Sequence, residues 1–428
     1  MKRLTAFFRV FFVISGLVSF GIGVSYASEF KPTGHPVSIG QKSAGGKNAV
    51  VVRGDFDSIE SVLEKMNRAH SIIDGRELEN YDLSEVSQLY INCGSDTPHS
   101  GVLNKVKKFV EEGGSLYISD WAHNYLEPWG FTFEDSGEEG FTTGYIKENG
   151  LKKYLKGKDK ISIHYDLSSW SVIKSSGGHK CKPLITGDVM TFGGPIQDAK
   201  LAILFKAGNG TILYTTFHTE EGMTKDAKDV LEFFADTTAI NSIVNEEFVE
   251  NNIPPSHLVA SNSSSLSSAK NLGIPVKIVP SGVAKFFLRI YDFSESAKNA
   301  FSESALMNSY SCTVDMYTPN GTLYRTLELQ NGKGAVEVPA NDNTPGEWSF
   351  KVQNFSGYSE KSNIMVISTG VNAEEDPGLV IIGPAKPSTP ERSPGVPPSA
   401  DSSGSGCNAG FSLFILPFLA LPLFLGRK

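Results

Sequence analysis

Cysteine and positive charge are both scarce in this chain. Its 428 residues include four Cys, and no Cys-x-x-Cys or His-x-x-x-His spacing occurs, which argues against a zinc finger or a related structural metal motif. Lys and Arg total 39 against 47 Asp and Glu, a formal net charge of −8. Without a basic excess, the chain is not expected to bind nucleic acid. Apolar residues make up 40% of the sequence, so a wholly disordered chain is excluded as well.

The sequence opens with an apolar stretch that follows basic residues. Lys2, Arg3 and Arg9 come first, the apolar run covers residues 10–24, and Ser25-Tyr26-Ala27 follows as a small-x-small cleavage site. This pattern predicts a signal peptide over residues 1–27, removed by signal peptidase after Ala27. An uncleaved membrane anchor is the alternative, and export follows from both readings.

A spacer and a second apolar stretch end the sequence. Residues 377–406 are rich in Pro, Ser and Gly and are expected to form a semi-extended spacer. Residues 407–428 start with a Cys-Asn-Ala-Gly motif at Cys407, continue as an apolar run and finish on two basic residues. Pro417 and Pro422 interrupt the short run, which suits a transient sorting helix better than a permanent membrane span.

The motif Ser405-Gly406-Cys407-Asn408-Ala409-Gly410-Phe411 resembles the Synergist-type C-terminal sorting domain of bacterial envelope proteins. The resemblance is confined to the end of the chain. It implies processing around Gly406 and Cys407 by an intramembrane sorting protease. The protein would be held at the membrane through its C-terminal segment, at the cell envelope or surface. A plain tail anchor is the alternative and predicts nearly the same localisation.

Residues 48–245 read as one α/β domain. Short β-rich runs alternate with amphipathic stretches, the pattern of a parallel sheet with helices packed on it. A turn at Gly208-Asn209-Gly210 then predicts a β-hairpin, and a closing helix is expected over 224–235. The region 127–198 is mixed and gives no clear elements. The expected strands are 49–53, 71–74, 88–93, 115–119, 201–205 and 211–217, and the earlier helices are 57–69 and 98–112.

Residues 270–370 change to a period-two alternation, with 261–268 expected as a polar linker before them. Seven short strand candidates in this region predict an all-β sandwich. Residues 345–352 resemble a late strand of extracellular immunoglobulin-like or prepeptidase-C-terminal-like modules. The strand candidates are 276–278, 285–290, 313–317, 322–324, 335–338, 348–352 and 364–367.

Residues 48–236 resemble the class I glutamine-amidotransferase-like superfamily, which has a flavodoxin-like sheet. Two segments carry the likeness: 114–121, Gly-Ser-Leu-Tyr-Ile-Ser-Asp-Trp, matches the strand-to-helix elbow of the nucleophile, and 216–220, Thr-Phe-His-Thr-Glu, matches the segment that supplies base and acid. The resemblance places Asp120 where the nucleophilic cysteine would sit. A carboxylate cannot replace the thiolate in covalent acyl transfer. No catalytic residue is therefore predicted, and His218 with Glu220 is expected as a structural hydrogen-bonded pair.

Other readings of the same residues remain open. Cys93 follows a strand and could be a reactive thiol, a packed thiol, or a disulfide partner of Cys181. Asp120, His123 and His218 could meet at a metal, but their spacing is not diagnostic, so an N-cap role for Asp120 and surface roles for the histidines are preferred.

We expect no cofactor and no metal. Trp121 and Trp129 could stack on a sugar at a pocket mouth. The preferred function is an exported, envelope-anchored surface protein with a non-catalytic domain used for binding or structure. An extracytoplasmic hydrolase using Cys93 or His218 and a glycan-binding module are the alternatives.

Overall fold

The computed structural model describes residues 48–219, 223–278, 282–293, 311–358 and 362–370. The expected signal peptide, spacer and sorting signal therefore lie outside the described residues, as do Ala27, Glu220, Gly406 and Cys407. Within the described ranges, no helix is both long and apolar enough to cross a membrane.

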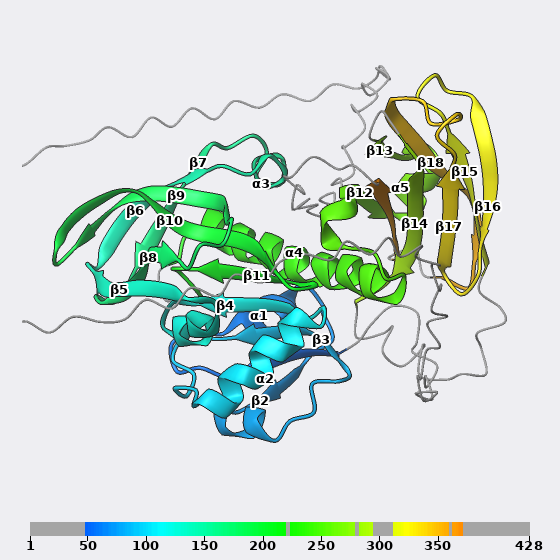
Figure 1. Cartoon of the computed structure of the whole chain (residues 1–428). Helices are drawn as coiled ribbons and strands as arrows, with labels where there is room; N and C mark the ends of the chain where they lie inside the picture. The colour runs from blue at the N-terminus through cyan, green and yellow to red at the C-terminus, as the bar shows by residue number, and fades with distance from the viewer. Residues whose placement is uncertain (1–47, 220–222, 279–281, 294–310, 359–361, 371–428) are drawn as a thin grey trace, which may run out of the picture.

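A parallel sheet forms the centre of the first unit (Figure 1). Its strands lie side by side in the order β2-β1-β3-β4-β11, every neighbouring pair being parallel. This is the flavodoxin-like order, in which the chain winds outward in both directions from the first strand. The bounds are β1 Asn48–Val52, β2 Ser71–Ile73, β3 Val86–Ile91, β4 Ser115–Ser119 and β11 Gly210–Thr215.

Helices cover both faces of this sheet because its strands alternate apolar side chains to either side. Val51 and Tyr90 lie in a core with α1, α3 and α4, whereas Val50 and Leu89 lie in a second core with α2 and the 3-10 helices η1 and η2. Burial on both faces is typical of parallel sheets. The helices are α1 Ile59–Lys65, η1 Gly75–Glu79, α2 Ser100–Glu111, η2 Asp120–Trp129, α3 Asn149–Tyr154 and α4 Lys225–Glu250.

The region 127–198, which the sequence left unassigned, extends the same sheet with antiparallel strands. The order continues from β11 through β10, β9, β5 and β8, with β6 and β7 attached at the side. The predicted hairpin is confirmed as β10 and β11. The added strands are β5 Phe131–Gly137, β6 Gly140–Ile146, β7 Lys160–Tyr165, β8 Trp170–Ser176, β9 Lys182–Thr191 and β10 Gly194–Ala207.

Two four-stranded antiparallel sheets follow, in the orders β12-β19-β14-β17 and β13-β18-β15-β16. Side chains from both sheets and from α5 form one buried cluster around Trp348 and Phe286. The seven predicted strands are all present. The elements are η3 Pro255–His257, β12 Leu258–Ser265, α5 Leu266–Leu272, β13 Ile274–Ile278, β14 Ala284–Tyr291, β15 Ser311–Tyr317, β16 Leu323–Leu329, β17 Lys333–Val338, β18 Gly346–Ser356 and β19 Asn363–Gly370.

Two sequence expectations about elements were wrong. Residues 261–268 are not a linker, because they form most of β12, which pairs with β19, and the start of α5. The helix expected over 224–235 continues to Glu250. Both errors have one cause: tertiary packing buries polar-looking segments, including Ser261 and Ser263 in β12 and Thr237 and Asn241 in α4, and so overrides their local propensity.

Candidate functional site

Three neighbouring parallel strands end at the same edge of the sheet and carry the site. Cys93 follows β3, Asp120 follows β4, and His218 follows β11. Register pairs Ile91 with Ile118 across the first two strands. Ligands of α/β proteins bind at the carboxyl ends of parallel strands, so the topology brings these side chains together although they are far apart in sequence.

Asp120 lies at the turn between β4 and η2 with a positive φ of 38°. Positive φ is uncommon for residues other than glycine, although Asp adopts it more readily than most, and such conformations often occur at functional sites. The side chain is buried, at 4% exposure. It does not cap the following helix: Ser119 is the N-cap residue, and the Asp120 Oδ1 atom accepts a hydrogen bond from Ser171 N–H at 2.7 Å. The predicted N-cap role of Asp120 was therefore wrong.

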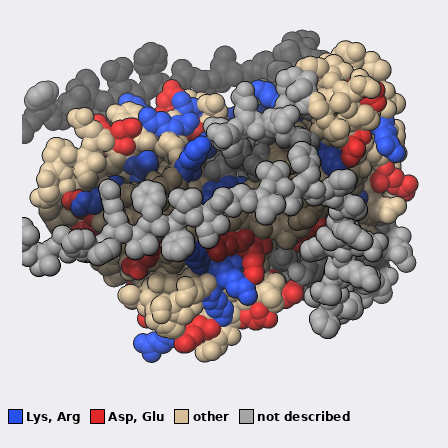
Figure 2. All heavy atoms as spheres, viewed as in Figure 1, with Lys and Arg blue, Asp and Glu red and all other residues tan. Residues whose placement is uncertain are grey.

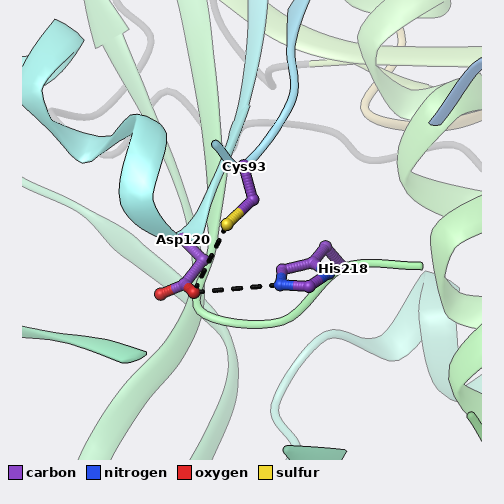
Figure 3. A group of neighbouring side chains, drawn as sticks. All are labelled: Cys93, Asp120 and His218. Carbon is purple, nitrogen blue, oxygen red and sulfur yellow. Dashed lines mark hydrogen bonds and ion pairs between the residues drawn. The ribbon is translucent and has the colours of Figure 1, made fainter. Parts of the chain in front are cut away.

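Cys93 and His218 both approach the other carboxylate oxygen of Asp120 (Figure 3). The Cys93 Sγ lies 3.6 Å from Oδ2, and His218 Nε2 lies 3.8 Å from the same atom. The three donor atoms all lie within 4.8 Å of one another, and all three residues are buried. His218 is therefore buried, and the predicted surface role of this histidine was wrong.

Burial sets the electrostatics of this cluster. Loss of solvent raises the pKa of Asp120 to about 7, while the nearby His218 charge opposes that shift. For Cys93, burial is again the main cause and the Asp120 charge adds to it, so the pKa of the thiol lies well above its usual range. The thiolate is the nucleophilic form, so this environment disfavours the reactive state of Cys93 at neutral pH.

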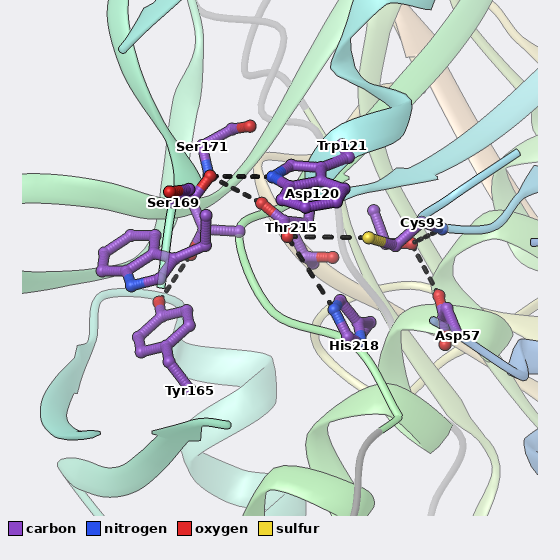
Figure 4. Close-up of polar contacts among 12 residues, drawn as sticks. Asp57, Cys93, Asp120, Trp121, Tyr165, Ser169, Ser171, Thr215 and His218 are labelled. Atoms are coloured by element: carbon purple, nitrogen blue, oxygen red, sulfur yellow. Dashed lines mark hydrogen bonds and ion pairs between the residues drawn. The ribbon is translucent and has the colours of Figure 1, made fainter. Parts of the chain in front are cut away.

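Asp57, the first residue of the helix expected over 57–69, joins the loops beside the cluster (Figure 4). Its carboxylate accepts hydrogen bonds from Ser119 Oγ at 2.6 Å and from Thr219 N–H at 3.0 Å. Ser119 Oγ in turn accepts a bond from Cys93 N–H at 2.9 Å. Asp57 follows β1, so the rule that found Cys93 and Asp120 at strand ends could have found it too. The N-cap residue of α1 is Ser58.

A small cavity of about 20 Å³ adjoins Cys93, Asp120 and His218, with Phe56 and Trp121 also in its lining. That volume holds about one water molecule. A larger pocket of about 760 Å³ lies beside it and shares Phe56, Leu167 and His218. The two exposed rings, Phe56 and Trp121, meet edge to face at 5.3 Å between centroids.

The remaining candidates lie elsewhere. His123 is buried and faces Ser171 Oγ at 2.9 Å, so it is neither a surface residue nor part of the cluster. Trp129 is buried, at 6% exposure, and cannot stack on a ligand with Trp121. Cys181 does not bridge to Cys93, since every cysteine in the described ranges is free. Glu220 lies outside those ranges, so its predicted hydrogen bond to His218 stays a prediction.

Comparisons with known proteins bear only on the fold. No family model and no curated protein matches the chain. Similar solved structures include a putative GMP synthase protein from Thermoplasma acidophilum, with 14% identity over 48% of this chain and 98% of the other and a TM-score of 0.35. A putative ThuA-like protein from Bacteroides uniformis has 14% identity over 49% of this chain and 96% of the other, with a TM-score of 0.35.

A glutamine amidotransferase from Thermotoga maritima has 13% identity over 48% of this chain and 90% of the other, with a TM-score of 0.30. Similar structures thus include amidotransferase-like and ThuA-like proteins, at low identity and over about half of the chain. Nothing about activity follows from scores this low, and the flavodoxin-like strand order of the chain itself defines the fold of its first unit.

Proposed function

We propose that this chain is an exported, envelope-anchored surface protein whose amidotransferase-like domain binds a ligand and does not transfer amide groups. The observation that carries this proposal is the position and bonding of Asp120. It occupies the elbow at the end of β4, and its Oδ1 atom is already engaged by Ser171 N–H. The only thiol near His218 among the described residues is Cys93, which burial keeps protonated.

Export and anchoring rest on residues 1–27 and 407–428. Their apolar runs with basic flanks support a signal peptide and a C-terminal sorting signal. We propose that the two-sheet unit is a β-sandwich, since both sheets contribute to one core, and that the spacer 377–406 holds it away from the membrane. Lys and Arg are interspersed with Asp and Glu on the face in Figure 2, in keeping with a partner other than nucleic acid.

Cell fractionation tests the anchoring. Cells carrying the wild-type chain should retain it in the envelope fraction in a processed form. The Cys407→Ala variant should accumulate unprocessed or leave the envelope, and a Cys312→Ser variant controls for loss of a thiol. Identical processing and retention of wild type and Cys407→Ala would refute the role of the motif.

Glutamine hydrolysis tests the loss of the family chemistry. The purified full chain should release no ammonia from glutamine above the rate in buffer. Release that disappears in a His218→Ala variant would contradict the proposal and favour the hydrolase alternative.

A glycan is the second candidate ligand, favoured by the exposed Trp121 ring beside Phe56 at the mouth of the cavity. Aromatic rings that face solvent at a pocket can stack on a sugar. A glycan array should then show binding that Trp121→Ala abolishes. Phe192→Ala is the matched control, because this ring is also exposed, at 65%, but does not line either pocket. Equal loss in both variants would exclude the Trp121 site.

A further inference from the structure

A thiol, a carboxylate and an imidazole that converge in a buried place form the donor set of a transition-metal site. One ligand atom from each of Cys93, Asp120 and His218 lies within 4.8 Å of the other two, and Cys93 Sγ and His218 Nε2 both face Asp120 Oδ2. Sulfur and imidazole nitrogen suit zinc and its neighbours, and a carboxylate oxygen completes sites of this class.

We propose that Cys93, Asp120 and His218 bind one divalent transition metal ion, with Zn²⁺ as the fitting example. Typical zinc bond lengths in a tetrahedral site separate sulfur from oxygen by about 3.5 Å and nitrogen from oxygen by about 3.4 Å. The structure has 3.6 Å between Cys93 Sγ and Asp120 Oδ2 and 3.8 Å between His218 Nε2 and the same oxygen. Rotation of the Cys93 and His218 side chains would also have to bring their ligand atoms, which lie within 4.8 Å of each other, to about 3.5 Å.

Hydrogen bonds from neighbouring residues orient His218 and Asp120 so that one atom of each is available to a metal ion. His218 Nδ1 lies 3.1 Å from the carbonyl oxygen of Thr219. A proton on Nδ1 makes that hydrogen bond and leaves Nε2 as the bare nitrogen, facing Asp120. Asp120 uses Oδ1 for the Ser171 N–H and keeps Oδ2 for the metal. Such outer contacts are the usual way in which proteins orient metal ligands.

The arrangement is wrong for a nucleophilic triad. In a Cys-His-acid triad the acid orients the imidazole at one ring nitrogen while the other nitrogen faces the nucleophile. Here the carboxylate lies on the Nε2 side, and a backbone carbonyl occupies the Nδ1 side. Asp120 Oδ2 is approached by both the thiol and the imidazole, which is the geometry of ligands around a shared centre.

Charge and space are also consistent with a dication. Metal binding replaces the Cys93 thiol proton, which passes to solvent, so thiolate and carboxylate together neutralise a charge of +2. The adjoining cavity of about 20 Å³ leaves a fourth position for one water molecule. Three protein ligands with one open position distinguish catalytic from closed structural zinc sites. This inference goes beyond the proposed function and does not depend on where the protein is anchored.

Metal binding by the full chain, purified in detergent and stripped with a chelator, tests the proposal. Zn²⁺ should rebind at one equivalent per chain, measured by elemental analysis after dialysis, and should raise the melting temperature. Co²⁺ at the same site should give the near-ultraviolet thiolate-to-metal band. Cys93→Ser should abolish that band. Cys93→Ser, Asp120→Asn and His218→Gln should each weaken Zn²⁺ binding more than about 100-fold, beyond the loss typical when a residue that only orients a ligand is changed.

Cys181→Ser is the matched control, since it removes another thiol of the same unit and should leave stoichiometry and spectrum unchanged. Cys407 is present in all these variants and cannot account for differences among them. Circular dichroism checks that each variant is folded. If Cys93→Ser does not fold, the proposal is tested by whether the thiolate-to-metal band is present in wild type and unchanged in Cys181→Ser. Zn²⁺ uptake well below one equivalent, Co²⁺ binding without the sulfur band, or a band lost in Cys181→Ser would overturn the site.

Discussion

At the scale of the residue, the site centres on Asp120. This residue follows β4 with a positive φ of 38° and presents a carboxylate, which is not the nucleophile of thiol-dependent acyl transfer. Cys93 is close, yet burial and the Asp120 charge keep its pKa high. Hydrogen bonds position the side chains of this site, and metal coordination is the chemistry that we propose for it.

The low reactivity of Cys93 can be measured directly. In the presence of a chelator at neutral pH, iodoacetamide should modify Cys93 at least about 10-fold more slowly than the half-buried Cys181, because Cys93 is only 1% exposed and holds its proton. Peptide mass spectrometry over time gives both rates in one sample. Rapid and selective labelling of Cys93 would instead support the hydrolase alternative.

Lys206 provides a prediction about pH. Its Nζ donates a hydrogen bond to Asn245 Oδ1 at 2.7 Å, and burial lowers the pKa of the ammonium group to about 7. Between pH 7 and 10 the unfolded chain binds a proton that the folded chain lacks, so this residue makes the folded state more stable as pH rises. Below the Lys206 pKa of about 7 in the folded chain, both states bind the proton and stability no longer changes with pH through this residue.

We therefore expect the free energy of unfolding of wild type to rise relative to that of Lys206→Met as pH increases from 7 to 10. The slope should be at most about 1.4 kcal/mol per pH unit. Urea titrations at both pH values measure it. A constant difference between the two proteins would show that Lys206 keeps its ordinary pKa.

At the scale of the element, the loops after the parallel strands depend on close backbone contact. A Cβ on Gly54, just after β1, would lie 2.1 Å from the carbonyl oxygen of Cys93. The neighbouring atom belongs to the backbone, so the loop after β3 would have to move. The position of Cys93 therefore depends on Gly54, which lies two residues after the end of β1.

Gly54→Ala should destabilise the protein by about 1–3 kcal/mol, the usual cost of overpacking, and should weaken metal binding by displacing Cys93. Gly101→Ala is the control: in the first turn of α2 its Cβ meets only the side chain of His99, and alanine favours a helix by up to about 1 kcal/mol. Chemical denaturation and the Zn²⁺ titration measure both. Equal stability of the two variants would contradict the tight contact.

At the scale of the whole molecule, α4 joins the two units. Its first half packs on the parallel sheet, and its second half packs on the outer face of β12, β14 and β19. The carboxylate of Glu247 in α4 forms an ion pair with the guanidinium of Arg289 in β14, with 2.6 Å between Glu247 Oε1 and the nearest Arg289 nitrogen. The Arg289 side chain is only 2% exposed. Figure 1 shows α4 running from the parallel sheet to β12 and β14. The units therefore share a buried ion pair as well as apolar contacts, and removing one member of that pair would leave an unpaired charge.

A fragment ending at residue 251 should expose the second half of α4 and lose stability. We expect it to bind a hydrophobic dye and to melt below the full chain, because Ile240 and Phe248 lose their cover. Differential scanning calorimetry and dye fluorescence measure this. Replacing Ile240 and Phe248 by Gln should reduce dye binding by the fragment. A fragment as stable and as free of dye as the full chain would show that the units are independent.

The order of elements could be predicted in large part from the sequence, because alternation of apolar residues reports burial locally. The strands at Val50, Leu89 and Leu116 and the hairpin at Gly208-Asn209-Gly210 follow from pattern and turn chemistry alone. The region 127–198 could not be assigned because β5 and β6 pair with the more distant strands β8 and β9, and such partners leave no local signal in the sequence. The strand β12 was missed because its serines look like a linker until β19 covers them.

By itself, the sequence determined that an alternating α/β region precedes a β-rich region, that Asp120 directly follows a strand, and that apolar runs with basic flanks lie near both ends. Only the tertiary structure decided that Cys93, rather than His123, meets the Asp120 carboxylate and His218, and that no disulfide ties Cys93 to Cys181. The reason is physical: local residue types set each strand and turn, whereas the meeting of side chains depends on strand order and register, which emerge when the whole sheet is assembled.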